Sequence, residues 1–355
     1  PIGNGPYKFS SLKREADGFI TEYLLITNEH FAKEKPLIKN FNVKFYTNSV
    51  KLLNAFNMRE IDGLGGLNPK NIDALRLTHN TIEKNLSQYY AIFLNKNTSA
   101  VLNDKQLVTA LDIATNREKI ITDIFSGKAL AINHPILPFI EDYASTTDSK
   151  PDFSLEKAAQ ILDKNGWVTN NETGIRGKKI GKKTETLEFS VVLPSISSIS
   201  DAVQIIKEDW ARIGVKLNPI VLSPTDIINE VMKTRNYQML FFGNISRNNS
   251  DVYSFWHSSE RFYPGLNLSL YNNKKVDNLL ESIRKNFDAD SRKKDVAKLQ
   301  STILDDAPAI FLYSPIYLYI GPRDFGGFDE RVLITPSDRF KSVNKWYMET
   351  KRVLK

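Results

Sequence analysis

The chain has 355 residues, of which 41% are hydrophobic, and its 48 basic and 41 acidic side chains give a formal net charge of +7. This length predicts two domains, each with enough apolar residues for a core of its own. The chain has no cysteine, which excludes disulfides, thiolate catalysis and cysteine-based zinc sites, and no stretch reaches the ~18 uninterrupted apolar residues of a membrane-spanning helix.

The first quarter of the chain alternates predicted strands and helices. Residues 19–27 predict a strand, and residues 41–47 alternate apolar and polar side chains, as a half-buried strand does. Apolar residues recur at helical spacing from residue 48, and this helix is expected to end at Gly63. The alternation predicts an α/β sheet rather than a helical bundle.

The next segment predicts one strand followed by three helices. Residues 89–97 are apolar enough for a buried strand. Residues 105–126 carry apolar side chains at helical spacing, and Asp104 and Asn116 are suited to cap the N-termini of two consecutive helices. Residues 155–166 predict a further short helix that ends at a glycine.

Positive charge is scattered along the chain, apart from the sequence RGKKIGKK at 176–183. A protein that reads nucleic acid concentrates its positive charge on one face, so nucleic acid is not an expected partner. Three glycines between residues 167 and 187 favour an exposed, lysine-rich hairpin, and a patch for phosphate or membrane is the alternative.

The C-terminal half again alternates strands and helices. The strand at 237–244 is almost continuously apolar, as expected for a strand that is covered on both faces. The other elements expected here are a strand at 187–194, a helix at 201–213, a strand from Val215, helices at 276–285 and 295–307, and two extended segments that meet at a turn within 308–321.

Several phrases of the sequence, in this order, resemble the extracytoplasmic solute-binding proteins of peptide ABC importers, the large dipeptide-, oligopeptide- and nickel-binding family. The phrases are GNGPYKF (3–9), MREIDG (58–63), LVTALDIATNREKIITDIFSGKA (107–129), AAQILDKNGW (158–167), IKEDWARIGVKL (206–217), NNKKVDNLLESIR (272–284) and LQSTILDDAPAIFLY (299–313). The chain departs from the family pattern at Asn4, where the family usually has threonine, and at Thr109 and Asn116 in the third of these phrases.

The resemblance implies an α/β fold of the type II periplasmic-binding-protein kind, with two lobes joined by a two-strand hinge. The crossings are expected near 92–97 and 310–320. Lobe I is then 1–92 with 318–355, lobe II is 93–317, and solute sits between lobes that close by a hinge motion. In the family the glycine-proline-tyrosine phrase lies well inside the protein, so we expect a signal peptide, any lipid-anchor cysteine and part of lobe I upstream.

The resemblance implies a monomeric binding component that works outside the cytoplasm, free in the periplasm or lipid-anchored, and delivers peptides to ABC permease subunits. No cofactor is expected. Two alternatives stay open: the same fold binding another solute, such as a metal chelate, an opine or an oligosaccharide, or the fold serving as the sensor domain of a cytoplasmic transcriptional regulator.

The expected ligand wall is the loop at 241–259, because α/β folds place their ligands beside loops that follow buried strands. In the family this loop often carries an aspartate that pairs with a peptide's amino terminus, so the resemblance implies this role for Asp251, with turn capping as the alternative. Arg247 is expected to face an acidic group or solvent, and Trp256 to stack on ligand or pack the loop. The residues predicted to bind ligand are Asn244, Arg247, Asn248, Asp251, Trp256, Tyr313 and Tyr317.

Enzymatic and metal-binding interpretations have little support in the sequence. His257 and Ser258 are adjacent, so their side chains are expected to point apart, and no nucleophile-elbow motif surrounds the serine. The four histidines have no metal-ligand spacing. We therefore expect neither a catalytic nor a metal site.

Overall fold

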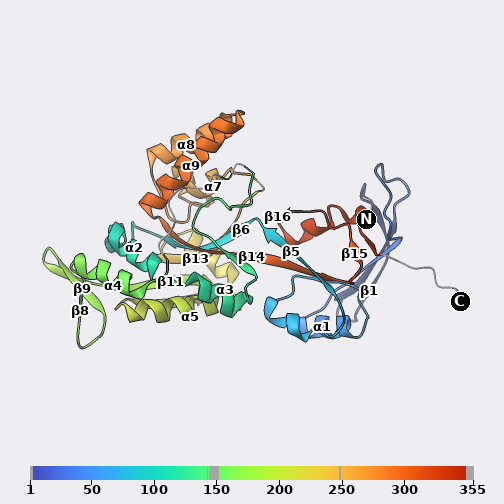
Figure 1. The fold of residues 1–355 in the computed structure, drawn as a ribbon, viewed down its shortest axis with the longest axis horizontal. Coiled ribbons are helices and arrows are strands. Elements are labelled where there is room, and N and C mark those ends of the chain that lie inside the picture. Colours follow the sequence, from blue (N-terminus) through green and yellow to red (C-terminus); the bar gives the residue numbers. More distant parts are fainter. Residues whose placement is uncertain (1–2, 142, 144–151, 248, 349–355) are drawn as a thin grey trace. The chain divides into compact units, whose positions relative to one another are not determined.

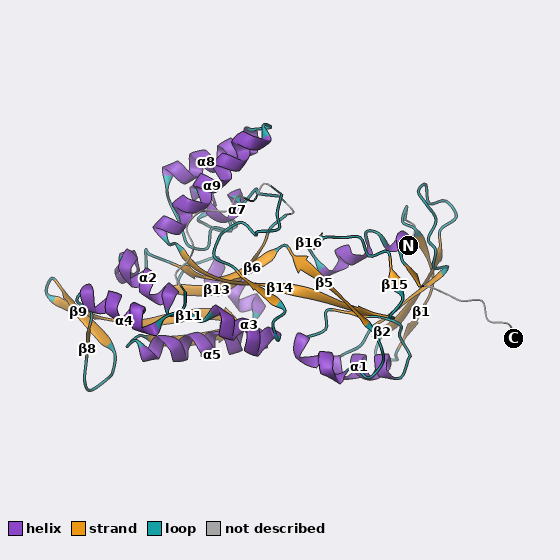
Figure 2. Cartoon of the chain, in the orientation of Figure 1, coloured by secondary structure: helices purple, strands orange, loops and turns teal. Residues whose placement is uncertain are grey.

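The computed structural model describes residues 3–141, 143, 152–247 and 249–348 (Figures 1 and 2). The chain divides into two compact units. Unit 1 is Pro1–Leu86 with Ile316–Lys355, and unit 2 is Ser87–Pro315.

The chain passes from one unit to the other twice, after Leu86 and after Pro315. The lobe limits expected from the resemblance were placed a few residues later, at 92/93 and 317/318, and the lobe assignment itself remains a prediction.

Unit 1 contains two larger sheets and the two-stranded β15–β17 ladder, and all three contribute residues to its cavity. In the first, β1, β2 and β3 are antiparallel in that order. In the second, β14 lies between β4 and β5, and β16 pairs with β5. The elements are β1 (Tyr7–Arg14), β2 (Ile20–Thr27), β3 (Asn40–Lys44), α1 (Ser49–Asn57), β4 (Leu64–Gly65), β5 (Asn80–Leu86), the end of β14 (Ala309–Gly321), β15 (Phe325–Gly326), β16 (Val332–Leu333) and β17 (Tyr347–Met348).

Helix α1 is shorter than the sequence predicted. It begins after Asn48, whose side chain accepts a hydrogen bond from the Lys51 backbone N–H at 2.9 Å. It ends at Asn57 rather than Gly63, because Arg59 takes a left-handed backbone conformation with φ of 61°. The residues after Arg59 are thereby free to run beside the cavity described below.

Unit 2 is built on a five-stranded path in the order β12-β11-β13-β6-β14, with β7 pairing with β14. The elements are β6 (Gln88–Leu94), α2 (Lys105–Ile113), α3 (Arg117–Phe125), β7 (Ala129–Ala131), α4 (Leu155–Lys164), β8 (Val168–Thr169), β9 (Arg176–Ile180), β10 (Lys183–Thr186), β11 (Glu188–Pro194), α5 (Ser197–Arg212), β12 (Lys216–Leu222), α6 (Pro224–Asp226), β13 (Met239–Ile245), α7 (Tyr253–Trp256), α8 (Lys274–Lys285), α9 (Ala289–Asp306) and the start of β14.

Helices cover both faces of the unit 2 sheet (Figure 1). Successive side chains of β6 point to opposite faces, so Ile92 joins the core formed with α2 to α5, whereas Phe93 joins the core formed with α7 to α9. Residues 239–241 of β13 are fully buried, which confirms the prediction of a strand covered on both faces.

Local signals in the sequence placed several helix and turn boundaries correctly. The Asp104 carboxylate accepts hydrogen bonds from the backbone N–H groups at the start of α2, and Asn116 does the same for α3. The predicted hairpin is formed by β9 and β10, with Gly181 at its tip at a φ of 61°.

Strand β14 corrects the prediction of two extended segments that meet at a turn. It is one continuous strand of 13 residues, and it pairs with β6 up to Tyr313 and with β5 from Ile316. Pro315 lies between the residues of β14 that pair with β6 and those that pair with β5. Because neither β6 nor β5 pairs with Pro315, the backbone N–H that proline lacks is not needed for those ladders. Residues 309–313 therefore lie beside 90–93, as the expectation of neighbouring crossing segments requires.

Candidate functional site

The first of the predicted ligand residues, Asn244, is buried at the end of β13. Only 3% of its surface is exposed, and its side-chain amide donates a hydrogen bond of 2.9 Å to the Tyr89 hydroxyl. Burial raises the pKa of Tyr89, although the contact with Asn244 opposes that shift. In the structure Asn244 is therefore buried inside unit 2 and hydrogen-bonded to Tyr89.

Arg247 is exposed, in agreement with the solvent-facing alternative. Its backbone oxygen accepts a hydrogen bond of 3.3 Å from the Ser87 hydroxyl, which holds the start of the loop to the start of β6. Asn248 lies outside the described residues. Contact of either side chain with a solute remains a prediction.

Asp251 is engaged by neighbouring groups of unit 2. Its carboxylate accepts hydrogen bonds of 3.0 and 3.1 Å from Arg284 Nε, lies 2.9 Å from Arg284 Nη2, and accepts one of 3.1 Å from the Tyr253 backbone N–H. The Arg284 guanidinium also lies 3.8 Å from the centroid of the Tyr253 ring. These contacts fit the turn-capping alternative, and pairing with a peptide ammonium remains a prediction.

Trp256 lies in the core of unit 2 and has no exposed surface. Its ring centroid is 5.8 Å from that of Phe311 and 6.2 Å from that of Phe93. Of the two roles that the sequence left open, this geometry supports packing, because an indole with no exposed surface offers no face to a solute.

The two predicted tyrosines of β14 are also buried, each in a different unit. Tyr313, in unit 2, stacks on Tyr90 with a centroid distance of 5.1 Å. The Tyr317 hydroxyl, in unit 1, packs directly against Gly65, so a Cβ at that position would displace it. Burial raises the pKa of both tyrosines, and neither hydroxyl has a hydrogen-bond partner among the described residues.

His257 contacts a serine other than the neighbour that the sequence drew attention to. Its Nδ1 lies 2.8 Å from the Ser259 hydroxyl, whereas the Ser258 hydroxyl donates to Asp277 at 2.6 Å. The adjacent pair therefore points apart, as predicted. In the described ranges there is no group of three or more histidine, aspartate or glutamate side chains placed to hold a metal ion.

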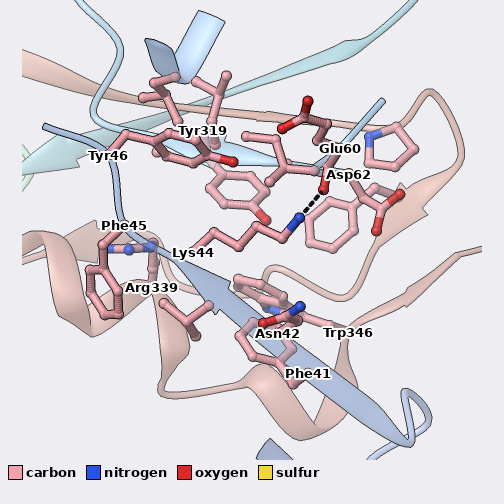
Figure 3. Close-up of a pocket in the computed structure, with 18 of the residues that line it drawn as sticks. Phe41, Asn42, Lys44, Phe45, Tyr46, Glu60, Asp62, Tyr319, Arg339 and Trp346 are labelled. Carbon is pink, nitrogen blue, oxygen red and sulfur yellow. Dashed lines mark hydrogen bonds between the residues drawn. The ribbon is translucent and has the colours of Figure 1, made fainter. Parts of the chain in front are cut away.

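Sequence reasoning did not predict a cavity of about 640 Å³ in unit 1, which Figure 3 shows in close-up. It is lined by residues 40–46, around β3, and by residues 60–65, which lead into β4, together with Tyr319 of β14 and a group of aromatic side chains near Trp346. The only signal for it in the sequence was the regular alternation of residues 41–45, which predicts a strand but not what lies beside it.

A lysine crosses this cavity. Lys44 Nζ donates a hydrogen bond of 2.9 Å to the backbone oxygen of Glu60 (Figure 3). The guanidinium of Arg339 lies 4.1 Å from the centroid of the Phe340 ring, and the ring centroids of Phe41 and Trp346 are 5.9 Å apart. The cavity thus combines aromatic walls, a few charged groups and the backbone of two strands.

The architecture defines a class of protein. In unit 2 helices cover both faces of the sheet, and the chain crosses twice between this unit and a second α/β unit. This is the fold of type II periplasmic binding proteins. The family model for bacterial extracellular solute-binding proteins, family 5 (middle part), matches residues 1–262, and the chain belongs to this family.

Two relatives illustrate the range of the family. The chain is 22% identical to the oligopeptide-binding protein AppA of Bacillus subtilis over 98% of this chain and 62% of that protein. The solved structure of AppA with a nonapeptide superposes with a TM-score of 0.74, at 20% identity, over 99% of this chain and 67% of that chain. That of NikZ from Campylobacter jejuni with Ni(L-His) also gives 0.74, at 22% identity, over 98% and 68%.

The chain spans 62%, 59% and 57% of the length of the first three curated relatives that it matches. None of the helices in the described ranges has both the length and the apolar character needed to cross a membrane.

Proposed function

We propose that this chain is part of the extracytoplasmic solute-binding component of an ABC importer, and that the component captures peptides and passes them to membrane permease subunits. The observation that carries the proposal is the family match over residues 1–262. It is supported by the fold shared with a protein whose structure holds a nonapeptide. The protein is proposed to work outside the cytoplasm as a monomer, either free in the periplasm or attached to the outer face of the cell membrane by a lipid anchor.

The physical chemistry of a peptide suits capture of this kind. An extended backbone presents donors and acceptors at regular intervals, so a protein can bind it through main-chain hydrogen bonds with little dependence on side chains. Each such bond contributes only about 0.5–1.5 kcal/mol, whereas micromolar binding needs about 8 kcal/mol. Several hydrogen bonds and apolar burial therefore act together.

The proposal is tested first by native mass spectrometry of the purified chain and then by thermal shift with peptides of two to eight residues. A ligand that binds only the folded state raises the unfolding temperature as its concentration increases. Co-purified peptide, or a concentration-dependent rise, is expected. A flat response to every peptide, with no mass above that of the chain, would count against peptide capture.

A metal chelate is the second candidate solute, because the chain has the same TM-score to the structure that holds Ni(L-His). The same assay with nickel alone, histidine alone and both together separates the two candidates. Stabilisation by nickel with histidine, and by no peptide, would favour the chelate.

Arg247 offers a residue-level test of the predicted ligand wall. We expect Arg247→Gln to weaken binding of peptides with acidic side chains about tenfold, the loss of one charge-assisted hydrogen bond. Lys182→Gln, in the exposed hairpin between β9 and β10, removes the same charge elsewhere and is the matched control. Equal affinities for both variants would place Arg247 away from the solute.

A further inference from the structure

The hairpin formed by β9 and β10 carries charge that the proposed function does not use. Four lysines lie in and beside its turn, namely Lys178, Lys179, Lys182 and Lys183. The last three are exposed, and within the described ranges no acidic side chain forms an ion pair with them. Glu185 lies opposite Lys178 in the ladder. The uncompensated charge therefore belongs to the three lysines nearest the turn.

The turn holds these charges in a defined arrangement around one aliphatic side chain. Ile180 pairs with Lys183, which leaves Gly181 and Lys182 as a two-residue loop. Gly181 has a φ of 61°, and a glycine with positive φ at the first loop position is the pattern of a type II′ hairpin turn. Ile180 is 49% exposed. The tip thus presents an isoleucine with Lys179 before it in the sequence and two lysines after it.

The small sheet formed by β8, β9 and β10 also carries a groove of about 780 Å³. Its lining includes lysines and threonines of the hairpin, namely Lys178, Lys179, Thr184 and Thr186. The carboxylate of Glu188, which lines the groove as well, is paired with Lys216 at 2.7 Å. Ammonium and hydroxyl groups are donors to phosphate oxygens. The groove therefore suits a headgroup that bears a phosphate.

The hairpin is accessible to a large partner. Strands β8, β9 and β10 form a sheet separate from the main sheet of unit 2, and in Figure 2 the strands β8 and β9 lie at one end of unit 2, beyond α4. A partner that approaches this end of the unit meets the lysines and Ile180 together.

An anionic membrane surface fits both kinds of side chain at the tip. Each lysine near such a surface strengthens binding about fivefold, because it is attracted by the anionic lipids. An aliphatic side chain gains by leaving water at the boundary between headgroups and acyl chains. A soluble phosphate polymer would satisfy the lysines but would leave Ile180 in water. The exposed isoleucine between the lysines therefore favours the membrane.

We propose that the β9–β10 hairpin is a contact site for the anionic phospholipid surface of a membrane. Ile180 lies at the boundary of the acyl chains, the three lysines nearest the turn bind lipid phosphates, and the groove takes a headgroup. The proposal rests on the proposed function in one respect, that a component which delivers solute to a permease works beside a membrane. The contact is reversible and is screened by salt.

Sedimentation of the full chain with vesicles measures this contact. The anionic probe is phosphatidylcholine with about 30% phosphatidylglycerol, whose surface attracts lysines, and pure phosphatidylcholine is the neutral probe. We expect binding to the anionic vesicles alone, and we expect it to weaken as salt rises from about 0.05 to 0.5 M. Binding of the same strength to both kinds of vesicle would overturn the proposal.

A pair of double variants separates the hairpin from the net charge of the chain. Lys182→Gln with Lys183→Gln is expected to lower the partition constant about 25-fold, about fivefold for each lysine. Lys293→Gln with Lys294→Gln removes two adjacent, exposed lysines from α9 and is the matched control. We expect it to lose at most about twofold, because charges far from the surface are screened. Equal losses in the two double variants would overturn the proposal.

A tryptophan at the tip reports whether the hairpin itself touches lipid. The four native tryptophans are fully buried, so in Ile180→Trp the new indole is the exposed one. With anionic vesicles we expect its emission to shift to shorter wavelength and its quenching by acrylamide to fall. An unchanged emission while the chain sediments with the vesicles would place the contact on another surface and overturn the proposal.

Inorganic polyphosphate distinguishes the membrane from a soluble phosphate. Ile180→Ser keeps the lysines, so we expect it to lower vesicle partition severalfold and to leave the affinity for polyphosphate unchanged. A vesicle partition that Ile180→Ser does not alter would assign the hairpin to soluble phosphates. These assays contain no peptide and the peptide assays contain no membrane, so Lys182→Gln remains a valid control there and either proposal can fail without the other.

Discussion

The indole nitrogen of Trp210 lies 3.1 Å from the Thr115 hydroxyl oxygen and 3.2 Å from the backbone oxygen of Leu111. Trp210 is on α5, Leu111 is in the last turn of α2, and Thr115 lies just after that helix ends, so these contacts join two helices on the same face of the unit 2 sheet. Trp210 is fully buried, and its N–H would otherwise be an unsatisfied donor in the core.

We expect Thr115→Val to lower the free energy of unfolding of unit 2 by about 1 kcal/mol, because the indole loses its better-placed acceptor. Urea denaturation monitored by tryptophan fluorescence measures this change. Thr109→Val is the matched control. Thr109 makes the same hydrogen bond to the backbone four residues earlier, but it is partly exposed, and within the described ranges its hydroxyl makes no hydrogen bond to an indole. A loss as large for Thr109→Val would contradict the prediction.

Trp256→Ala is expected to destabilise unit 2 by about 3–5 kcal/mol, the usual cost of removing a large aromatic side chain from a core. This differs from what a ligand-stacking tryptophan would do, namely weaken solute binding without unfolding the protein. Trp256 has no exposed surface, so we expect the stability effect. Thermal unfolding followed by circular dichroism measures it, and an unchanged unfolding temperature would contradict packing as the main role.

Asp251→Asn is expected to cost less than about 1 kcal/mol of stability, since the ion pair with Arg284 is partly exposed. We also expect the peptide affinity of this variant to stay within about twofold of that of the unchanged chain, because the Asp251 carboxylate is already paired with Arg284. Calorimetric titration checks the affinity. Arg284→Gln removes the same ion pair but leaves the carboxylate in place. A tenfold loss for Asp251→Asn alone would identify Asp251 as the anchor of a peptide ammonium.

Asp209 introduces a pH dependence into unit 2. Its side chain is buried on α5, and burial raises the pKa of its carboxyl above the ordinary value, although Arg212 Nη1 at 3.8 Å partly opposes the shift. A raised pKa in the folded state means that this group favours folding at low pH. Its contribution is lost as the pH rises through the folded pKa.

We therefore expect Asp209→Asn to stabilise unit 2 more at pH 7 than at pH 4, as measured by urea denaturation at the two pH values. Asp201→Asn removes an exposed carboxylate from the same helix and controls for the loss of one charge. A larger gain at pH 4 than at pH 7 would show that burial does not govern the titration of Asp209.

Local patterns were sufficient for most elements of the fold. The helix caps at Asp104 and Asn116 depend only on residues two or three positions away, and the β9–β10 hairpin depends on Gly181 within its own turn. Both were predicted correctly for that reason. The end of α1 was misplaced because a positive φ at Arg59, rather than a glycine, ends the helix.

The residue pattern is enough to assign the α/β fold and the solute-binding family, because periodicity and family phrases are properties of the chain read in order. It could not show that Asp251 would be paired with Arg284, 33 residues away. Nor could it show that β3 and residues 60–65 would border one cavity. Periodicity indicates which side chains point inward. The residues that these side chains contact depend on how distant segments of the chain pack together, and only the tertiary structure determines this packing.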